Sequence, residues 1–315
     1  MKRPPAHVPV LLTHVLDVLS PRPGQTIVDC TLGLAGHSAA ILQHILPGGR
    51  LIATDFDPAN IAAARARLAR LGVEGRDFFL FHTNFAALPA VLLQAGVERA
   101  DALRADGGVA STQIDDPARG FSYRRHGPLD MRMDPTRGQP ASALVNRLSE
   151  RELAEAILEL GDETDAPTIA RLIVERRAET PITTTQQLMA IVCQARDFTI
   201  QRAAGAKLHP AARTFQALRI LVNRELANLD RLLAVLPDVL APGGVAAIIT
   251  FHSGEDRRVK AAFRDGLRAG TYADVSPDPL TADPAEREAN PRSRSAKLRW
   301  ARSPAAHHPS DGSPA

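Results

Sequence analysis

Short β-favouring runs alternate with helical patterns through the first hundred residues, and this alternation constrains the fold more than any other feature. The run Thr26–Cys30 is followed by a turn of small residues and then by a helical pattern over His37–Leu46. Strands separated by helices are parallel and joined by crossovers, which predicts an α/β, doubly wound sheet. Further strands are expected at Arg50–Asp55, Phe78–Phe81, Ala102–Asp106 and Val245–Phe251.

A long interval separates the fourth and fifth predicted strands. More than a hundred residues lie between Asp106 and Val245, whereas a crossover needs about a dozen. The last part of the interval, Phe215–Leu236, repeats apolar residues at helical spacing and predicts the crossover helix itself. The earlier part carries capping-box signatures such as Ser149 with Glu152, which predict additional helices.

We therefore expect a helical domain inserted into a discontinuous α/β domain. The inserted domain is predicted at 115–213, and the α/β domain at 1–114 and 214–302. The tail 303–315 is rich in Pro, Ser and His and is expected to be disordered.

Composition excludes several classes of protein. The chain is 44% hydrophobic and 23% charged with a formal net charge of +3, as in ordinary soluble globular proteins. Cys30 and Cys193 are its two cysteines, which excludes a disulfide framework or a cysteine-rich zinc site and fits a reducing cytosol. No apolar run approaches the roughly 18 residues of a membrane span. We expect a cytoplasmic protein with no metal and no membrane partner; the composition sets no oligomeric state and is compatible with a homodimer.

The turn after the first strand reads GLAGHS over 33–38 and opens a helix. Such turns bind nucleotides in doubly wound sheets, because backbone N–H groups and the helix dipole face the ligand. The turn is not G-x-G-x-x-G, since Ala35 and Ser38 occupy two of the glycine positions. A pyrophosphate-binding NAD oxidoreductase is therefore disfavoured, and S-adenosylmethionine fits better. A tight turn without a ligand is the alternative reading.

Carboxylates end two of the predicted strands. Asp55 lies about 20 residues after the turn, where it can accept both ribose hydroxyls of a nucleoside. Asp57 competes for that role, but the following Pro58 indicates a helix cap. Asp106 ends the fourth strand at the ligand-binding edge, where a carboxylate is better explained by function than by folding.

Other polar or aromatic residues near these strands have structural explanations as well. His37 lies in the first helical turn, where a local hydrogen bond is more usual than catalysis. Phe85 follows the third strand and either joins the core or flanks an adenine ring. The pair Asp115 and Asp116 indicates a turn or helix cap rather than a metal site, and Ser253 with Asp256 predicts a helix N-cap.

Two segments are locally basic. One spans Asn290–Arg302 and contains no acidic residue, and the other lies between Arg119 and Arg137. Such segments suit a polyanion partner, although a solvated surface is the commoner explanation.

Four long motifs carry a resemblance to a known family. They begin at Asp106 (DGGVASTQIDDPARGFSYRRHGPLDMRMD), His209 (HPAARTFQALRI), Phe251 (FHSGEDR) and Asn290 (NPRSRSAKLR). Together they resemble the ribosomal RNA small subunit methyltransferase H family, also called MraW, along nearly the whole chain. The resemblance implies a class I, Rossmann-like methyltransferase with a helical insertion. It also implies methyl transfer from S-adenosylmethionine to N4 of a cytidine in the decoding region of 16S rRNA.

The resemblance also implies site residues. Asp106 is the candidate acceptor in the methyl-transfer pocket, and holding the methionine amino group is an equally compatible role. The cofactor contacts carried over by motif are Ala35, Gly36, His37, Asp55, Phe85, Asp106 and Gln113. The candidates for contact with rRNA or an assembled small subunit are Arg119, Phe121, Tyr123, Arg124, Arg125, Arg132, Arg292, Arg294, Lys297 and Arg299, with loop packing as the alternative for the two aromatic residues.

The chain departs from the family pattern close to the cofactor turn. Ala35 stands where the family usually has glycine, and Gly107 replaces an apolar packing residue. Arg104 falls inside a predicted buried strand, where a charge is costly unless it is paired. These departures motivate a second hypothesis, a catalytically weak or inactive paralogue that binds rRNA or small subunits.

Overall fold

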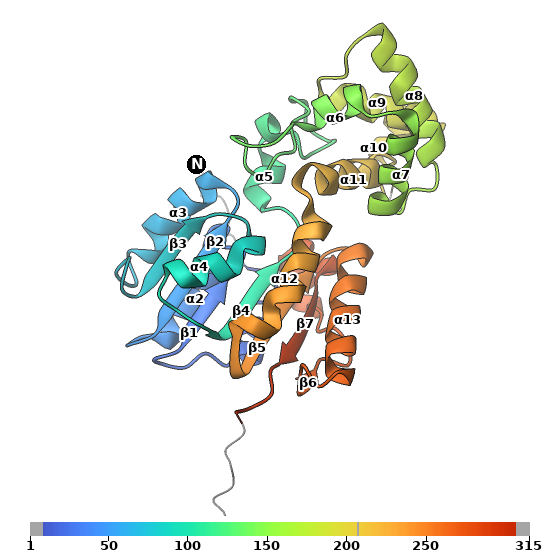
Figure 1. Ribbon diagram of the computed structural model, residues 1–315. Helices are drawn as coiled ribbons and strands as arrows, with labels where there is room; N and C mark the ends of the chain where they lie inside the picture. The colour runs from blue at the N-terminus through green and yellow to red at the C-terminus, as the bar shows by residue number, and fades with distance from the viewer. Residues whose placement is uncertain (1–8, 207, 307–315) are drawn as a thin grey trace, which may run out of the picture. The chain divides into compact units, whose positions relative to one another are not determined.

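A computed structural model describes residues 9–206 and 208–306 of the chain. The chain forms two compact units (Figure 1). Unit 1 comprises the chain up to Gly108 and from Ala227 onwards, and unit 2 comprises Val109–Leu226. The inserted domain was expected at 115–213; the compact unit begins earlier and ends later, because α11 packs on α7 and so belongs with the helices of the insertion.

Unit 1 is built on a seven-stranded sheet in the order β3-β2-β1-β4-β5-β7-β6. Strands β1 to β5 are parallel, whereas β7 runs antiparallel to β5 and β6. This is the doubly wound α/β sheet predicted from the sequence, with its switch in strand order between β1 and β4. The strands are β1 (Thr26–Asp29), β2 (Arg50–Asp55), β3 (Phe78–His82), β4 (Ala100–Asp106), β5 (Leu240–Thr250), β6 (Asp274–Val275) and β7 (Lys297–Arg302).

Both faces of the sheet are covered, because parallel strands need apolar layers on each side. Ile27 and Ala102 lie in the core beneath α1, α2 and α3. Val28 and Leu103, one position further along their strands, lie in the core beneath α4, α12 and α13. The helices of this part are α1 (Leu12–Leu19), α2 (Gly36–Ile45), α3 (Pro58–Leu68), α4 (Leu88–Gln94), α12 (Glu225–Val239), α13 (Ser253–Arg268) and α14 (Pro284–Ala289), with single 3₁₀ turns η1 (Phe85–Ala87) and η3 (Pro291–Ser295).

Unit 2 is helical and has its own apolar core. Leu153, Ile157, Ile173 and Leu218 are all fully buried in it. The Ser149 capping box predicted from the sequence begins α7, with the Ser149 N–H donating to Glu152 Oε2 over 2.8 Å. The helices are α5 (Ser111–Asp115), α6 (Ala141–Arg147), α7 (Glu150–Gly161), α8 (Ala166–Glu179), α9 (Thr185–Ala195), α10 (Ile200–Ala204) and α11 (Ala212–Asn223), with the 3₁₀ turn η2 (Pro117–Arg119).

Three details differ from the sequence-based expectations. The crossover pattern over 215–236 is two helices, because Arg224 adopts a left-handed backbone with φ of 52° between α11 and α12. The strands β6 and β7 were not predicted. The tail expected to be disordered from Ser303 begins with ordered residues: the Ser303 N–H donates to Gly244 O over 2.9 Å. The remainder of that prediction, 307–315, lies outside the described residues.

Within the described ranges, the helices are all too short or too polar to cross a membrane.

Candidate cofactor site

The carboxyl ends of the parallel strands meet at one edge of the sheet, where α/β proteins bind ligands. Asp55 ends β2 and links this edge to the turn after β1. Its Oδ2 accepts from the Gly33 N–H over 2.7 Å, and its Oδ1 accepts from the Asp57 N–H over 2.8 Å. Burial raises the pKa of Asp55 to about 6, an effect that the hydrogen bonds to Asp57, Gly33 and Asn60 oppose. Asp57 itself caps α3 by accepting from the Ala59 N–H, as its position before Pro58 predicted.

The turn itself has the backbone of a glycine-rich loop. Gly33 and Ala35 are both left-handed, with φ of 50° and 56°. Left-handed backbone is costly for a residue with a side chain, so the alanine at 35 carries strain where glycine would not. Gly36 is required by close approach, since a Cβ there would lie 2.5 Å from Cγ of Pro9. The methyl group of Ala35 is fully buried within the core beneath α2 rather than exposed at the turn.

His37 is buried and held locally. Its Nε2 lies 2.9 Å from Val10 O, and this nitrogen is the donor because a carbonyl oxygen can only accept. Its Nδ1 lies 4.0 Å from Asp106 Oδ2, beyond hydrogen-bond distance. The local hydrogen bond favoured by the sequence is present, and it ties the segment before α1 to the start of α2.

The charge of Arg104 within β4 is paired. Its Nη1 donates to Asp29 Oδ1 over 2.8 Å, and its Nη2 forms an ion pair with Asp106 Oδ2. Burial lowers the pKa of Arg104, but the two carboxylates outweigh that effect and raise it above its ordinary value. Asp106 also retains an acceptor: Oδ1 is buried and has no hydrogen-bond partner among the described residues.

Phe85 and Gln113 occupy different surroundings. Phe85 begins η1 shortly after β3 and is half-buried against the core beneath α4. Gln113 belongs to unit 2, where it is 4% exposed and its Oε1 accepts from the Ala110 N–H over 2.9 Å. Asp55, Asp106 and the turn share one edge of unit 1, because each lies at the carboxyl end of a parallel strand. Gln113 belongs to the other unit, so its contact with the cofactor stays a prediction.

Comparison with known proteins identifies the chain. The MraW methylase family matches residues 5–304. The chain belongs to this family. A ribosomal RNA small subunit methyltransferase H from Acidobacterium capsulatum is 46% identical over 299 residues, which cover 94% of this chain and 97% of the relative. Another from Nitratidesulfovibrio vulgaris is 47% identical over 311 residues, covering 94% and 85%. The crystal structure of an rRNA methylase from Streptococcus thermophilus aligns with a TM-score of 0.40 at 11% identity, over 96% of this chain and 99% of that one.

As an MraW methylase, the chain is an enzyme that uses S-adenosylmethionine, and the edge described above fits that cofactor. S-adenosylmethionine offers hydrogen-bond donors at its ribose hydroxyls and its methionine ammonium. The edge offers acceptors: Oδ2 of Asp55 accepts from the Gly33 N–H and has a second lone pair available, and Oδ1 of Asp106 is buried with no partner among the described residues. A buried acceptor without a partner is costly unless a ligand satisfies it.

The sequence of this MraW methylase gave a wrong prediction for the N-cap of α13, where the connection from β5 ends. Ser253 and Asp256 were predicted to cap α13, but Ser253 is already helical and His252 is the N-cap. Glu255 completes the capping box: its Oε2 accepts from the N–H of the N-cap His252 over 3.4 Å and from the preceding Phe251 N–H over 2.8 Å. A Cβ at Gly107 would lie 2.4 Å from Glu255 Oε1, so the glycine makes room for this carboxylate.

The predicted RNA-contacting residues of unit 2 divide into two groups. Arg119 donates to the Met133 carbonyl over 2.7 Å, and Arg132 pairs with Asp130 over 2.7 Å, so both are used within the fold. Phe121 is 8% exposed, which favours loop packing over base stacking. Arg124 and Arg125 are exposed. Tyr123 is half-buried, and its ring stacks on His209 with centroids 4.4 Å apart.

The basic C-terminal segment divides in the same way. Arg299 was expected to contact RNA but is 5% exposed, because β7 turns its side chain toward α13, where its Nε donates to Asp256 Oδ1 over 2.7 Å. Lys297 pairs with the same carboxylate over 3.1 Å. Arg292 and Arg294, in η3, are exposed.

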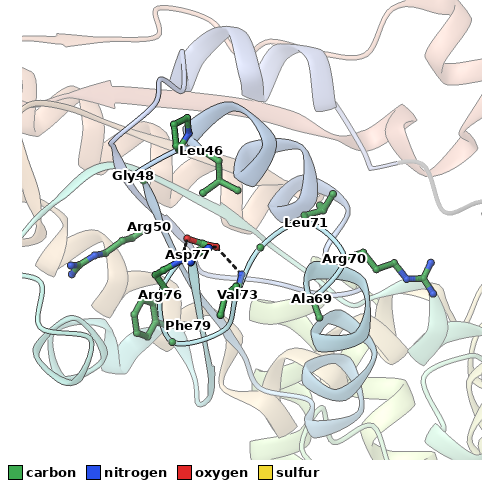
Figure 2. Close-up of a pocket in the computed structure, with 14 residues that line it drawn as sticks. Leu46, Gly48, Arg50, Ala69, Arg70, Leu71, Val73, Arg76, Asp77 and Phe79 are labelled. Carbon is green, nitrogen blue, oxygen red and sulfur yellow. Dashed lines mark hydrogen bonds and ion pairs between the residues drawn. The ribbon is translucent and has the colours of Figure 1, made fainter.

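A hollow of about 940 Å³ opens at the amino ends of β2 and β3, the edge opposite the cofactor turn (Figure 2). Its walls include Arg50, Arg70 and Arg76, and Arg76 pairs with Asp77 over 2.8 Å. Figure 2 shows Arg50 and Arg70 extending away from one another. Because these side chains do not converge, we assign no ligand to this hollow.

Proposed function

We propose that the chain transfers a methyl group from S-adenosylmethionine to N4 of a cytidine in 16S rRNA of the small ribosomal subunit. Its membership in the MraW methylase family and the names of its close relatives support this reaction. The observation that carries the site assignment is the buried Oδ1 of Asp106 on the ligand edge, which has no hydrogen-bond partner in the part of the chain that the structure describes.

The chemistry demands positioning more than acid or base strength. The N4 amine of cytosine is a weak nucleophile, because its lone pair is delocalised into the ring. S-adenosylmethionine supplies an electrophilic methyl group on a sulfonium. Transfer to the amine would leave the neutral thioether S-adenosylhomocysteine, and the amine would release one proton to solvent water. The protein has to align the amine with the methyl group and accept its N–H hydrogen bonds.

Two carboxylates divide these tasks. Asp55, at the end of β2, accepts hydrogen bonds from the ribose hydroxyls and so fixes the nucleoside. Asp106, at the end of β4, accepts from an N–H donor, either the methionine ammonium or the cytosine amine. The turn at 33–36, which follows β1, would line the cofactor on the side of that strand.

Substrate contact is assigned to the exposed basic residues. Arg124 and Arg125 in unit 2 are exposed, and so are Arg292 and Arg294 in η3 of unit 1. Their exposure supports a role in contacting phosphate groups. The cytidine has to be splayed from its stack to reach a methyl donor. A substrate of this kind supports a cytoplasmic location for the protein.

A catalytically inactive RNA-binding paralogue is not favoured. The departures that motivated it are accommodated: Arg104 is paired with Asp29 and Asp106, and the turn keeps its left-handed geometry with Ala35 in place of glycine.

Nucleoside mass spectrometry on small subunits that lack the native modification tests the proposal. Incubation with the protein and S-adenosylmethionine is expected to yield N4-methylcytidine at up to one per subunit. Asp106→Ala is expected to abolish transfer while leaving RNA binding intact. Absence of the product with folded wild-type protein, beside an active control enzyme, would reject the proposed reaction, and full transfer by Asp106→Ala would reject the role of Asp106.

A further inference from the structure

A single buried guanidinium bridges two carboxylates where the strand order of unit 1 switches. Arg104 is 1% exposed and lies in register with Asp29 on the neighbouring parallel strand. Asp29, Arg104 and Asp106 all face the layer beneath α2, because alternate residues of a strand share a face. Nη1 of Arg104 contacts Asp29 and the carbonyl of Thr31, and Nη2 contacts Asp106.

The two carboxylates depend on Arg104 to different degrees. Asp29 has other donors: its Oδ2 accepts from Ser38 Oγ over 2.5 Å, and its Oδ1 accepts from the Thr31 N–H over 3.1 Å. For the Asp106 side chain, Arg104 Nη2 is the charged partner closer than 4.0 Å among the described residues; the contact is an ion pair without hydrogen-bond geometry, and His37 Nδ1 is 4.0 Å away. The orientation of the Asp106 carboxylate is therefore set by Arg104.

We propose that Arg104 is a positioning residue of the methyl-transfer site, which holds the Asp106 carboxylate so that Oδ1 receives an N–H donor. This inference rests on the proposed function. The donor is either the ammonium of the methionine moiety or the amine of the cytosine. Both make the same kind of hydrogen bond, and the two are separated by the experiment below.

The shape of arginine suits this task. A guanidinium is planar and presents donors in a rigid fork, so it contacts two carboxylates at once and limits the rotation of each. A lysine at 104 would carry the same charge as a point on a flexible stem. An apolar residue would leave Asp29 and Asp106 without a cation in a buried strand pair, which is costly.

The test separates positioning from simple charge balance. Arg104→Leu removes the guanidinium, and the double variant Asp29→Asn with Arg104→Leu also removes the buried charge that Arg104 neutralises. Thermal unfolding reports the stability of each. Calorimetry reports S-adenosylmethionine affinity, and steady-state transfer to small subunits reports kcat and KM. The wild-type protein, measured alongside, has to bind S-adenosylmethionine and form N4-methylcytidine; failure there rejects the proposed function rather than the role of Arg104.

The double variant is expected to regain stability relative to Arg104→Leu but to stay impaired at least tenfold in one functional step. Weaker S-adenosylmethionine binding would identify the ammonium as the donor. A lower kcat at saturating S-adenosylmethionine, with KM for subunits unchanged, would identify the cytosine amine. A double variant with wild-type binding and kcat would overturn the proposal, because Arg104 would then serve only to neutralise Asp29.

Arg104→Lys keeps the test decisive if the leucine variants do not fold. It retains the positive charge and is expected to fold. Its S-adenosylmethionine affinity or kcat should lie between those of wild-type and Arg104→Leu. If no leucine variant folds, the expected loss relative to wild-type is at least a few fold. Binding and kcat equal to wild-type in Arg104→Lys would overturn the requirement for a fork-shaped contact.

Discussion

The backbone N–H of Gly33 donates to Oδ2 of Asp55 over 2.7 Å, and this bond joins the cofactor turn to the end of β2. The second oxygen of Asp55 accepts from the Asp57 N–H and the Asn60 amide. The carboxylate is thus fixed by groups from both sides before any ligand binds. Preorganisation of this kind lowers the entropy cost of binding.

Asp55→Asn is expected to weaken S-adenosylmethionine binding roughly 10- to 100-fold, the loss of one charge-assisted hydrogen bond of about 1.5–3 kcal/mol. The asparagine keeps one acceptor oxygen, but its NH2 group then faces N–H donors that the second carboxylate oxygen accepts from in the wild-type protein, the Asp57 N–H and the Asn60 amide. Thermal stability should therefore fall, by about 1–3 kcal/mol for the donors left without an acceptor. Calorimetric titration measures the affinity. An affinity equal to wild-type would mean that the ribose is held by other groups.

S-adenosylmethionine affinity is expected to level off above about pH 7 and to fall as the pH drops through 6. The pKa of Asp55 is raised to about 6, and the protonated acid is a poorer acceptor for ribose hydroxyls.

The raised pKa of Asp55 affects folding stability with the opposite sign to cofactor affinity. A folded pKa above the unfolded value of about 3.9 stabilises the protein at low pH, and that contribution is lost as pH rises from about 4 through 6.

Calorimetry between pH 5 and 8 tests this dependence, with Asp55→Asn as the matched control because its side chain does not titrate. The wild-type curve should bend near pH 6 and the control curve should not. An identical bend in both would assign the titration to another group.

The strands β1 to β5 were predictable because their signals are local. Each is an apolar run followed by a turn or helix start, as at Thr26–Cys30, and parallel order follows from the alternation with helices. Asp55 and Asp106 could be selected for the same reason, since they end such runs.

Other features depend on contacts that no local pattern reveals. The run that forms β7 alternates basic with apolar residues and resembles a solvated segment; its Arg299 is neutralised by Asp256, which lies 43 residues away in the sequence. Apolar spacing continues on both sides of Arg224, so the break between α11 and α12 leaves no periodic trace. Arg104 acquires its partners only when β1 and β4 pair.

Gly120→Ala is expected to destabilise unit 2 by more than about 3 kcal/mol. Gly120 has φ of 71°, and a Cβ there would lie 2.2 Å from the backbone oxygen of Pro128. Gly138 is the matched control: its φ is 72°, but a Cβ there meets nothing within 4 Å. Gly138→Ala should therefore cost about 1–2 kcal/mol, the left-handed term alone. Chemical denaturation compares the two, and equal losses would show that the contact with Pro128 relaxes without cost.

Arg299→Leu and Arg294→Ala are expected to separate folding from RNA contact in the basic C-terminal segment. Arg299 is buried against Asp256, so its loss should lower the free energy of unfolding by about 2–3 kcal/mol. This is less than the cost of breaking a buried ion pair that has one cation, because Lys297 still faces the Asp256 carboxylate. Arg294 is exposed, so its loss should leave the unfolding temperature unchanged, weaken binding to small-subunit rRNA and reduce the salt dependence of that binding by about one unit of slope. Thermal unfolding and RNA binding at several salt concentrations measure both. An Arg294→Ala variant with the wild-type salt dependence would remove η3 from the proposed RNA surface.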